Sequence, residues 1–520
     1  MKPIPEIRAE NGVSTFYVDG EPFLSLGGEL HNSSSSCTEY MRSNVWNRLQ
    51  NLCYNSVIAT VSWEQIEHQQ GKFDFSIVDD LLSDARKEGI RLILIWFGLW
   101  KNGESTYVPG WMKKDHRKYW KCVMEKNATK ITQTISPLCL DAVEADALAF
   151  AELMKYIRIN DPEYTVIMMQ VENEMGLLGS ARDHSPAADE LFAKDIPQEL
   201  ASEYNVSGDW KTAFGFDADE YFMAWHYAIA TEIIAAAGIK EHPLPMYVNA
   251  WLRQHPDKAG KYPSGGPVAN VMKIWRLAAP SICLYAPDIY TPFFEDVCAE
   301  YAADGNPLFI PETRRTIASA STVFLAVGKF NALGFHPFGI ESMFGENENT
   351  LTDSELLALN IDPSALRAAE NAGETLSASY SLLLGMWSTI SKYRGTKHLN
   401  GFYQGSDDSG CMLRFTNYDL EISYDLLAKG GVPAGGLVIE ISENEFILAG
   451  INFRACFHPK NGDDRCVDFV QIREGTFKEG VWQPGRILNG DEQGVYARSK
   501  PKALKVELLL RNVHDYGLPV

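Results

Sequence analysis

The sequence lacks the patterns that mark several common protein classes. Its 520 residues contain no uninterrupted run near the roughly 18 apolar residues of a membrane helix, so we expect no membrane partner. The first residues, Met-Lys-Pro-Ile-Pro-Glu, carry no apolar signal core, and we expect no export. No G-x-G-x-x-G loop follows the first predicted strand and no P-loop occurs, which disfavours a nucleotide-binding sheet.

Cysteine and histidine are scattered along the chain. The nine cysteines form no C-x-x-C pair, so we expect neither a disulfide framework nor a zinc ribbon, and we predict a reducing, cytoplasmic compartment. The eleven histidines form no His-x-His or His-Glu-x-x-His pattern, which disfavours a metal-dependent barrel hydrolase. The sequence therefore predicts no metal and no other cofactor.

Positive charge is also in short supply. Lysine and arginine number 47 against 68 acidic residues, which gives a net charge of −21. Such a surface repels phosphate backbones, so we expect no nucleic-acid partner, whereas a neutral sugar would not be repelled. Solubility of the surface explains the acidity equally well.

What the sequence does contain is an alternation of short apolar runs with longer helix-compatible stretches, from residue 20 to about 342. Eight runs are strand-like, at 23–30, 56–63, 91–98, 165–174, 246–251, 282–290, 308–312 and 334–340. Several are apolar on both faces, as parallel strands covered from both sides should be. Eight strand-helix repeats predict a closed (β/α)8 TIM barrel of the α/β class. An open doubly wound sheet is the alternative, and its loop fingerprint is missing.

The predicted helices include 79–88, 145–158, 218–237 and 296–303, with Gly89 and Gly238 as stop signals for the first and third. A helical segment at 365–393 completes the barrel. Alternating apolar and polar residues then follow between turn signals, at 411–415, 436–441, 446–451, 467–473 and 504–510. A chain of this length predicts two domains: a catalytic barrel over 1–394 and a small antiparallel β-sandwich over 395–520.

Two of the predicted strands end in a carboxylate. The fourth ends Gln170-Val171-Glu172-Asn173-Glu174 and the seventh ends Phe309-Ile310-Pro311-Glu312. Barrel enzymes place their reactive groups at the C-terminal ends of the strands. Glycoside hydrolysis needs two facing carboxylates, one to attack the anomeric carbon and one to protonate the leaving oxygen. A single glutamate at a strand end is more often a solvated or ion-paired loop residue, so the prediction depends on the pair.

These residues resemble a known group. Asn173-Glu174 together with Glu312 resembles the clan of retaining glycosidases built on this barrel, and within it the β-galactosidases of glycoside hydrolase family 35 and the related family 42. Further matching segments are Gly27-Gly28-Glu29-Leu30-His31, Trp63-x-x-x-Glu67-x-x-x-Gly71-x-Phe73-Asp74-Phe75 and Pro109-Gly110-Trp111. The resemblance covers roughly residues 20–345 and indicates a divergent bacterial branch with a C-terminal β module.

The sequence departs from the family 35 pattern near the second and third strands. Glu64, Gln65 and Ile66 stand where the family usually has Asn, Leu and His, and His68 replaces a proline. Trp96 lies in a region where the family often carries a Glu-Trp pair that contacts sugar. These departures bear on which sugar is recognised and leave the reaction unaffected.

The resemblance implies that Glu174 is the general acid/base, that Glu312 is the nucleophile and that Tyr290 hydrogen-bonds the nucleophile. By strand period Glu172 shares a face with Glu174 and competes for the acid role. Arg314 and Arg315 either lower the pKa of Glu312 or fix the loop that follows it. The predicted sugar-contacting residues are Asn173, Glu64, His31, Asn249, Trp96, Trp111 and Trp251.

The sequence thus predicts a retaining, exo-acting β-glycosidase that cleaves an oligosaccharide or glycoside through a covalent glycosyl-enzyme, with β-galactosidase as the first candidate. The alternatives are a non-catalytic carbohydrate-binding protein, or the same mechanism in a β-glucosidase, an arabinosidase or a transglycosylase. Carboxyl groups about 5–5.5 Å apart would indicate retention and about 6.5–9.5 Å inversion. A homo-oligomer is left open.

Overall fold

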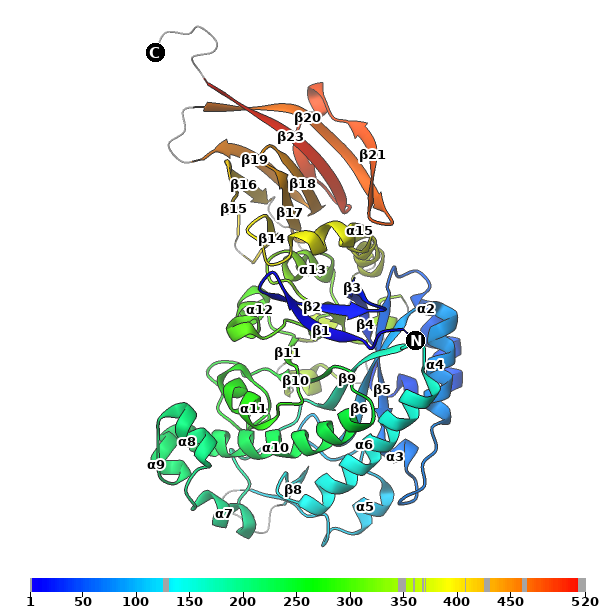
Figure 1. The fold of residues 1–520 in the computed structure, drawn as a ribbon, viewed down its shortest axis with the longest axis vertical. Helices are drawn as coiled ribbons and strands as arrows, with labels where there is room; N and C mark the ends of the chain where they lie inside the picture. The colour runs from blue at the N-terminus through cyan, green and yellow to red at the C-terminus, as the bar shows by residue number, and fades with distance from the viewer. Residues whose placement is uncertain are drawn as a thin grey trace.

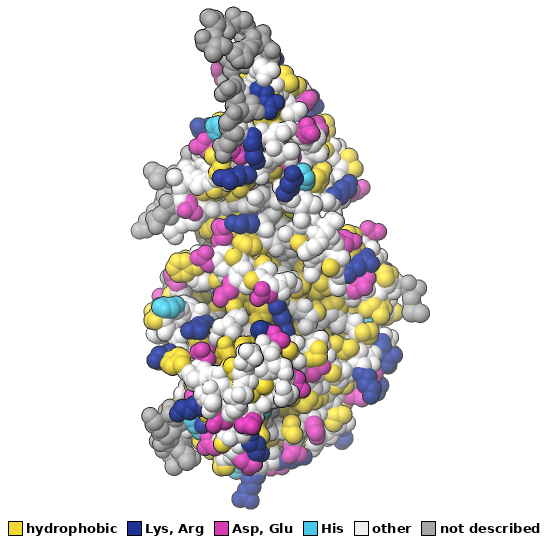
Figure 2. Space-filling view, turned by 60° about the vertical axis from the view of Figure 1, so that its left-hand side comes forward, with side chains coloured by type: hydrophobic (Ala, Val, Ile, Leu, Met, Phe, Trp, Pro, Cys, Tyr) yellow, Lys and Arg dark blue, Asp and Glu magenta, His cyan; other side chains and the backbone are white. Residues whose placement is uncertain are grey.

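The computed structural model describes residues 2–124, 131–344, 352–358, 361–366, 369, 371–406, 408–424, 431–460 and 465–512. Figure 1 shows a barrel in blue to green and a β module in yellow to red stacked along the long axis of the molecule. On the face shown in Figure 2, acidic and basic side chains are intermixed.

Eight parallel strands close into a barrel, which confirms the predicted TIM-barrel fold. Around the barrel they are β4 (Ser25–Glu29), β5 (Ser56–Ser62), β6 (Arg91–Lys101), β9 (Val166–Asn173), β10 (Met246–Trp251), β11 (Leu284–Ile289), β12 (Ile310–Thr313) and β13 (Gly334–Pro337). The barrel closes where Gly334 of β13 pairs with Ser25 of β4. Each of the eight lies on one of the predicted runs.

The strands are buried on both faces, which explains their nearly continuous apolar sequences. Inside the barrel, Ile58, Ile95 and Phe309 belong to one buried cluster, which also includes Phe16 and Val18 of the N-terminal segment. That segment forms a small antiparallel sheet of β1 (Glu6–Glu10), β2 (Val13–Val18) and β3 (Glu21–Phe23), which the sequence analysis did not predict. It contributes apolar side chains to the barrel interior.

The principal helices are α4 (Ser76–Glu88), α6 (Leu140–Asn160), α10 (Ala218–Glu241), α12 (Phe294–Tyr301), α13 (Ser319–Gly328) and α15 (Ala372–Tyr393). Helix α4 ends at Gly89, whose φ of 70° is the left-handed conformation expected of a glycine stop signal. The predicted end of α10 before Gly238 is wrong. The helix continues to Glu241. Gly238 lies where α10 packs on α6, and a glycine is needed there because a Cβ would overlap the ring of Phe150.

Shorter elements occupy the connections. They are α1 (Thr38–Tyr40), α2 (Trp46–Leu49), α3 (Trp63–Ile66), α5 (Gly110–Lys114), β7 (Lys121–Val123), β8 (Ile131–Ile135), α7 (Pro186–Phe192), α8 (Gln198–Tyr204), α9 (Trp210–Phe214), α11 (Met272–Ala278) and α14 (Asp353–Ala358). Among the described residues, one helical stretch, Trp210–Glu241, is long and apolar enough to cross a membrane by composition alone. Its most apolar window is 61% buried, as in a core helix.

The C-terminal part consists of antiparallel sheets, as predicted. One sheet has the order β14 (Leu399–Tyr403), β17 (Gly435–Ser442), β18 (Glu445–Ile451), β23 (Lys502–Asn512), β20 (Arg465–Lys478), β21 (Val481–Ile487). The other has the order β15 (Gly410–Arg414), β16 (Tyr418–Tyr424), β19 (Phe453–Pro459), β22 (Val495–Ala497). A single apolar cluster draws on both sheets, so they pack face to face as a sandwich.

The sandwich rests on the outer helices of the barrel. Ser321 Oγ on α13 donates a hydrogen bond to the carbonyl of Pro433, and Gly328 approaches Gly401 of β14 so closely that a Cβ would meet its Cα. Each of the nine cysteines, all of which lie in the described ranges, is free. The predicted cytoplasmic location stays a prediction.

Candidate functional site

A cavity of about 640 Å³ opens at the C-terminal ends of the barrel strands. Its walls come from the segments that follow six different strands, and among the described residues they include Lys101, Glu174, Tyr290, Glu312, His31 and Phe338. The described part of the β-sandwich contributes no residue to this lining. The described lining of the cavity therefore comes from the barrel and from the segment that follows its last strand.

The end of β9 determines which of its two glutamates faces the cavity. Glu172 and Glu174 both adopt positive φ, 63° and 43°, a conformation that is costly for residues other than glycine and is concentrated at functional sites. The break in strand geometry overturns the expectation that both side chains share a face. Glu174 lines the cavity, whereas Glu172 is fully buried and accepts hydrogen bonds from the backbone amides of Leu99 and Trp100.

Glu312 reaches the same cavity from the opposite side, at the end of β12. Tyr290 Oη donates a hydrogen bond to Glu312 Oε2 at 2.7 Å, the contact that the resemblance implied. One carboxylate oxygen of Glu312 and one of Glu174 lie within 4.8 Å of each other, although 138 positions separate the residues in the chain. This upper limit lies just below the range of about 5–5.5 Å for retaining glycosidases and well below that for inverting ones.

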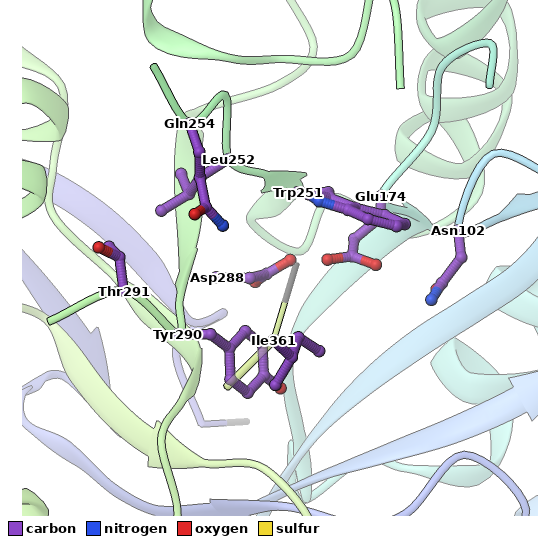
Figure 3. Close-up of a pocket in the computed structure, with 9 residues that line it drawn as sticks. All are labelled: Asn102, Glu174, Trp251, Leu252, Gln254, Asp288, Tyr290, Thr291 and Ile361. Carbon is purple, nitrogen blue, oxygen red and sulfur yellow. The ribbon is translucent and has the colours of Figure 1, made fainter. Parts of the chain in front are cut away.

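Two groups that the sequence analysis missed lie beside the pair. Asp288, on β11, has a carboxylate oxygen within the same 4.8 Å of both Glu174 and Glu312. Figure 3 shows Asp288 beside Glu174. Lys101, at the end of β6, lies close enough to lower the pKa of both glutamates. Asp288 precedes Tyr290 by two residues, so strand alternation could have placed it on the same face.

The electrostatics differ between the two glutamates. Burial raises the pKa of Glu174 to about 7, and the negative charge of Glu312 adds to this rise, while Lys101 and a hydrogen bond with Asp288 oppose it. Burial also raises the pKa of Glu312, but Lys101 and the Tyr290 hydroxyl counteract it. Glu174 is therefore suited to hold a proton at neutral pH, as a general acid must.

Lys101 is the cation that lowers the pKa of the predicted nucleophile, Glu312, whereas the sequence had suggested Arg314 and Arg315 for this effect. Arg315 is buried and donates hydrogen bonds to the carbonyls of Phe338, Gly339 and Leu366, so it fixes the loop, as one of the two alternatives stated. Arg314 is partly exposed.

The other predicted contact residues divide into two groups. His31 lines the large cavity and its Nε2 lies 2.8 Å from Ser342 Oγ, and Trp251 lines a smaller adjoining cavity beside Glu174 (Figure 3). Asn249 and Asn173 are fully buried beneath the glutamates. Asn249 Oδ1 accepts the backbone N–H of Glu174 at 2.8 Å, and Asn173, with its amide oxygen turned toward Lys101, accepts from Nζ at 3.1 Å.

Glu64, Trp96 and Trp111 are not part of the described lining of either cavity. Glu64 forms an ion pair with Lys113 at 2.8 Å. The Trp96 indole N–H donates to Asp146, and that of Trp111 donates to the carbonyl of Glu67. The hydrogen-bonding groups of these three side chains are therefore used within the fold.

The three carboxylates of Glu174, Asp288 and Glu312 are also close enough to hold a cation. A proton on one of these carboxyl groups and the charge of Lys101 account for their proximity equally well. The expectation that the protein needs no metal stays a prediction, which metal analysis of the purified protein tests.

Comparison with known proteins matches part of the barrel to a family model. Residues 15–232 match the model of glycosyl hydrolases family 35, and residues 376–498 match the model of a domain of unknown function, DUF5597. The first match supports a β-glycosidase and confirms the resemblance seen in the sequence. No curated protein sequence matches the chain.

Solved structures with similar folds include three glycosidases. The β-galactosidase of Bacillus circulans sp. alkalophilus is 10% identical, over 93% of this chain and 99% of that chain, with a TM-score of 0.49. The cold-adapted β-galactosidase of Rahnella sp. R3 is 14% identical, over 72% of this chain and 57% of that chain (TM-score 0.46). The β-1,4-D-mannanase of Cryptopygus antarcticus is 12% identical, over 73% of this chain and 94% of that chain (TM-score 0.43).

Proposed function

We propose that the chain, whose residues 15–232 match the model of glycosyl hydrolases family 35, is a retaining, exo-acting β-glycosidase with β-galactosides as its first candidate substrates. The observation that carries the proposal is the short separation of the Glu174 and Glu312 carboxylates across one cavity. A water molecule needs a wider gap to attack from the face opposite an acid, whereas a carboxylate nucleophile needs this one.

The reaction has two displacements. Glu312 attacks the anomeric carbon while Glu174 gives its proton to the glycosidic oxygen, so the leaving group departs as an alcohol and the sugar becomes an ester of Glu312. Glu174, now a carboxylate, then removes a proton from water, whose oxygen attacks the anomeric carbon and releases Glu312. The configuration at that carbon is inverted twice and therefore retained.

The charges near the site fit this sequence. Before the first step, the negative charge of Glu312 helps to keep the proton on Glu174. Forming the ester removes that charge, so the pKa of Glu174 falls when it must act as a base. The Tyr290 hydroxyl and the Lys101 ammonium favour the ionised form of Glu312 that attacks.

The arrangement of cavities indicates where the leaving group lies. A small cavity is lined by Glu174 but not by Glu312, and it adjoins a further cavity of about 400 Å³ with which it shares Leu252, Gln254 and Thr291. Because Glu174 protonates the leaving oxygen, we place the leaving group on this side. Phe293 lines the further cavity and is 66% exposed, as a ring that stacks on a sugar would be.

Replacing that ring tests the placement of the leaving group. Phe293→Ala should raise KM for an oligosaccharide substrate by about 2- to 10-fold, the worth of one ring contact, and leave nitrophenyl glycosides unaffected because their leaving group is shorter. Equal effects on both substrates, or none on either, would place the leaving group elsewhere. Leu277→Ala, which removes an exposed apolar side chain that does not line these cavities, is the matched control.

The proposal as a whole is tested by a screen of nitrophenyl β-galactoside, β-glucoside, β-xyloside and α-arabinoside. Turnover of at least one, with NMR of the first-formed sugar showing the same anomer as in the substrate, is the expected result. The opposite anomer would mean inversion. Saturable sugar binding without turnover of any substrate would favour the carbohydrate-binding alternative. Alcohol acceptors added to the active substrate measure transglycosylation.

A further inference from the structure

Asp288 is a third carboxyl group at the site, and the two displacements above do not use it. It is 3% exposed and lies on β11, where its backbone is in register with Glu312 of β12 and Trp251 of β10. One of its carboxylate oxygens lies within 4.8 Å of one of Glu174, and Figure 3 shows the two carboxyl groups pointing toward each other. A hydrogen bond between the two side chains lowers the pKa of Glu174 and raises that of Asp288. Two carboxyl groups can hydrogen-bond only if one of them carries a proton.

The contacts of the two Asp288 oxygens indicate where that proton is. Oδ2 accepts a hydrogen bond from Asn249 Nδ2 at 2.8 Å, as a carbonyl-type oxygen does. Oδ1 is buried and has no donor among the described residues. A buried carboxylate oxygen without a donor is costly, whereas a protonated oxygen is itself the donor and needs only an acceptor.

We propose that Asp288 is a positioning residue that keeps its proton on Oδ1 and donates a hydrogen bond to the carboxyl group of Glu174 throughout the cycle. This inference rests on the proposed function of Glu174. When Glu174 is protonated, its own hydroxyl is left to face the glycosidic oxygen. When Glu174 is ionised, the bond from Asp288 stabilises the carboxylate that accepts a proton from water, and Asp288 itself neither gains nor loses one.

The surroundings of Asp288 favour the neutral form. Burial raises its pKa well above the usual range, and the negative charges of Glu312, Glu174 and Glu29 raise it further. Lys101 of β6 lowers the pKa of those three glutamates. The other titratable groups that face Asp288 are hydroxyls, namely those of Tyr247 on β10, Tyr290 after β11 and Tyr301 on α12.

The test compares two substitutions of one residue. Asp288→Asn reproduces the inferred pattern, because its amide oxygen accepts from Asn249 and its N–H donates to Glu174. We expect kcat within about threefold of the parent and an unchanged alkaline limb of the kcat/KM–pH profile. Asp288→Ala removes the donor, so the pKa of Glu174 rises, the alkaline limb moves to higher pH, and kcat falls about 10- to 100-fold, as for a lost hydrogen bond to a charged group.

A matched control is Asp146→Ala. It also removes a buried carboxyl group that is hydrogen-bonded to another, in this case Glu172, but outside the cavity. Its alkaline limb should stay in place. Two results would overturn the inference. If Asp288→Asn is as impaired as Asp288→Ala, Asp288 is ionised. If neither Asp288 variant moves the alkaline limb, Asp288 has a purely structural role.

A measurement without substrate separates this inference from the proposed function. Infrared spectra of the folded protein at pH 8 should contain the carbonyl stretch of protonated carboxyl groups, and Asp288→Asn should remove one group's share of that band. An unchanged band would overturn the inference even if the enzyme is active. A reduced band in a protein that hydrolyses no glycoside would support proton retention by Asp288 and refute the function instead.

Discussion

The barrel contains two sets of buried carboxyl groups, and their difference shows what makes one of them reactive. Asp146 and Glu172 form a sealed pair, in which the Trp96 indole and the backbone amides of Leu99 and Trp100 donate to their oxygens. Glu174, Asp288 and Glu312 form the cavity set, where Asp288 Oδ1 and Glu312 Oε1 have no donor in the described structure. Burial raises the pKa in both sets, so a raised pKa alone does not identify the site.

A single backbone feature separates the two sets. Glu172 and Glu174 are two residues apart on β9, and a regular strand would direct both to one side. The left-handed conformation of Glu172 sends its side chain toward α6 and leaves Glu174 in the cavity. Local strain therefore assigns one glutamate to structure and the other to chemistry.

The largest expected effect comes from exchanging the acid. Glu174→Ala should reduce kcat about 10²- to 10⁴-fold for substrates with poor leaving groups, because general acid catalysis is lost. Dinitrophenyl glycosides, whose leaving groups need no proton, should keep their rate of glycosylation. Steady-state and burst kinetics with both substrate types measure this. Equal losses for both types would contradict the acid role.

A smaller effect is expected from the cation beside the cavity set. The kcat/KM–pH profile should be bell-shaped, with Glu312 protonated on the acid side and Glu174 deprotonated above about pH 7. Lys101→Met removes the charge that lowers both pKa values, so both limbs should move to higher pH by about one unit. Lys113→Met, whose partner is Glu64 outside the cavity, is the control. If both limbs of the kcat/KM–pH profile stay in place in Lys101→Met, Lys101 does not lower the pKa of the two glutamates.

Removing a member of the sealed pair, Asp146 and Glu172, should lower the stability of the fold and leave the turnover rate nearly unchanged. Asp146→Ala leaves the Trp96 and Leu99 donors without this acceptor, so the free energy of unfolding at neutral pH should fall by about 1–3 kcal/mol. Folding raises the pKa of Asp146 to about 6, so the contribution of this carboxyl group to stability declines as pH rises from about 4 through 6. In Asp146→Ala, this pH dependence of the free energy of unfolding should be absent. Urea titrations at pH 5 and pH 7 measure both. A large loss of kcat with normal stability would break the distinction between the two sets.

The sequence predicted the barrel because parallel strands covered on both faces leave a strong apolar signal. It also pointed to Glu174 and Glu312, since each stands at the end of such a run, and the family resemblance added Tyr290. The β1–β3 sheet was missed because its strands are short and partly exposed, and the stop at Gly238 was wrong because that glycine serves helix packing.

Other site features depend on three-dimensional contacts that no local pattern encodes. Lys101 extends an apolar strand by one residue, and its role depends on β9 and β12 lying nearby. Trp96 looked like a sugar-contacting ring, but the strand turns it toward Asp146 on α6. The positive φ of Glu172, which decides between two adjacent glutamates, has no signature in the residue type.

Azide rescue tests most directly whether Glu174 and Glu312 act on the same sugar carbon. With azide, Glu312→Gly should regain turnover and yield the α-glycosyl azide, because azide attacks from the side that the lost carboxylate occupied. Glu174→Ala with azide should yield the β-glycosyl azide from the glycosyl-enzyme. Rescue of neither variant, or the same anomer from both, would contradict the account.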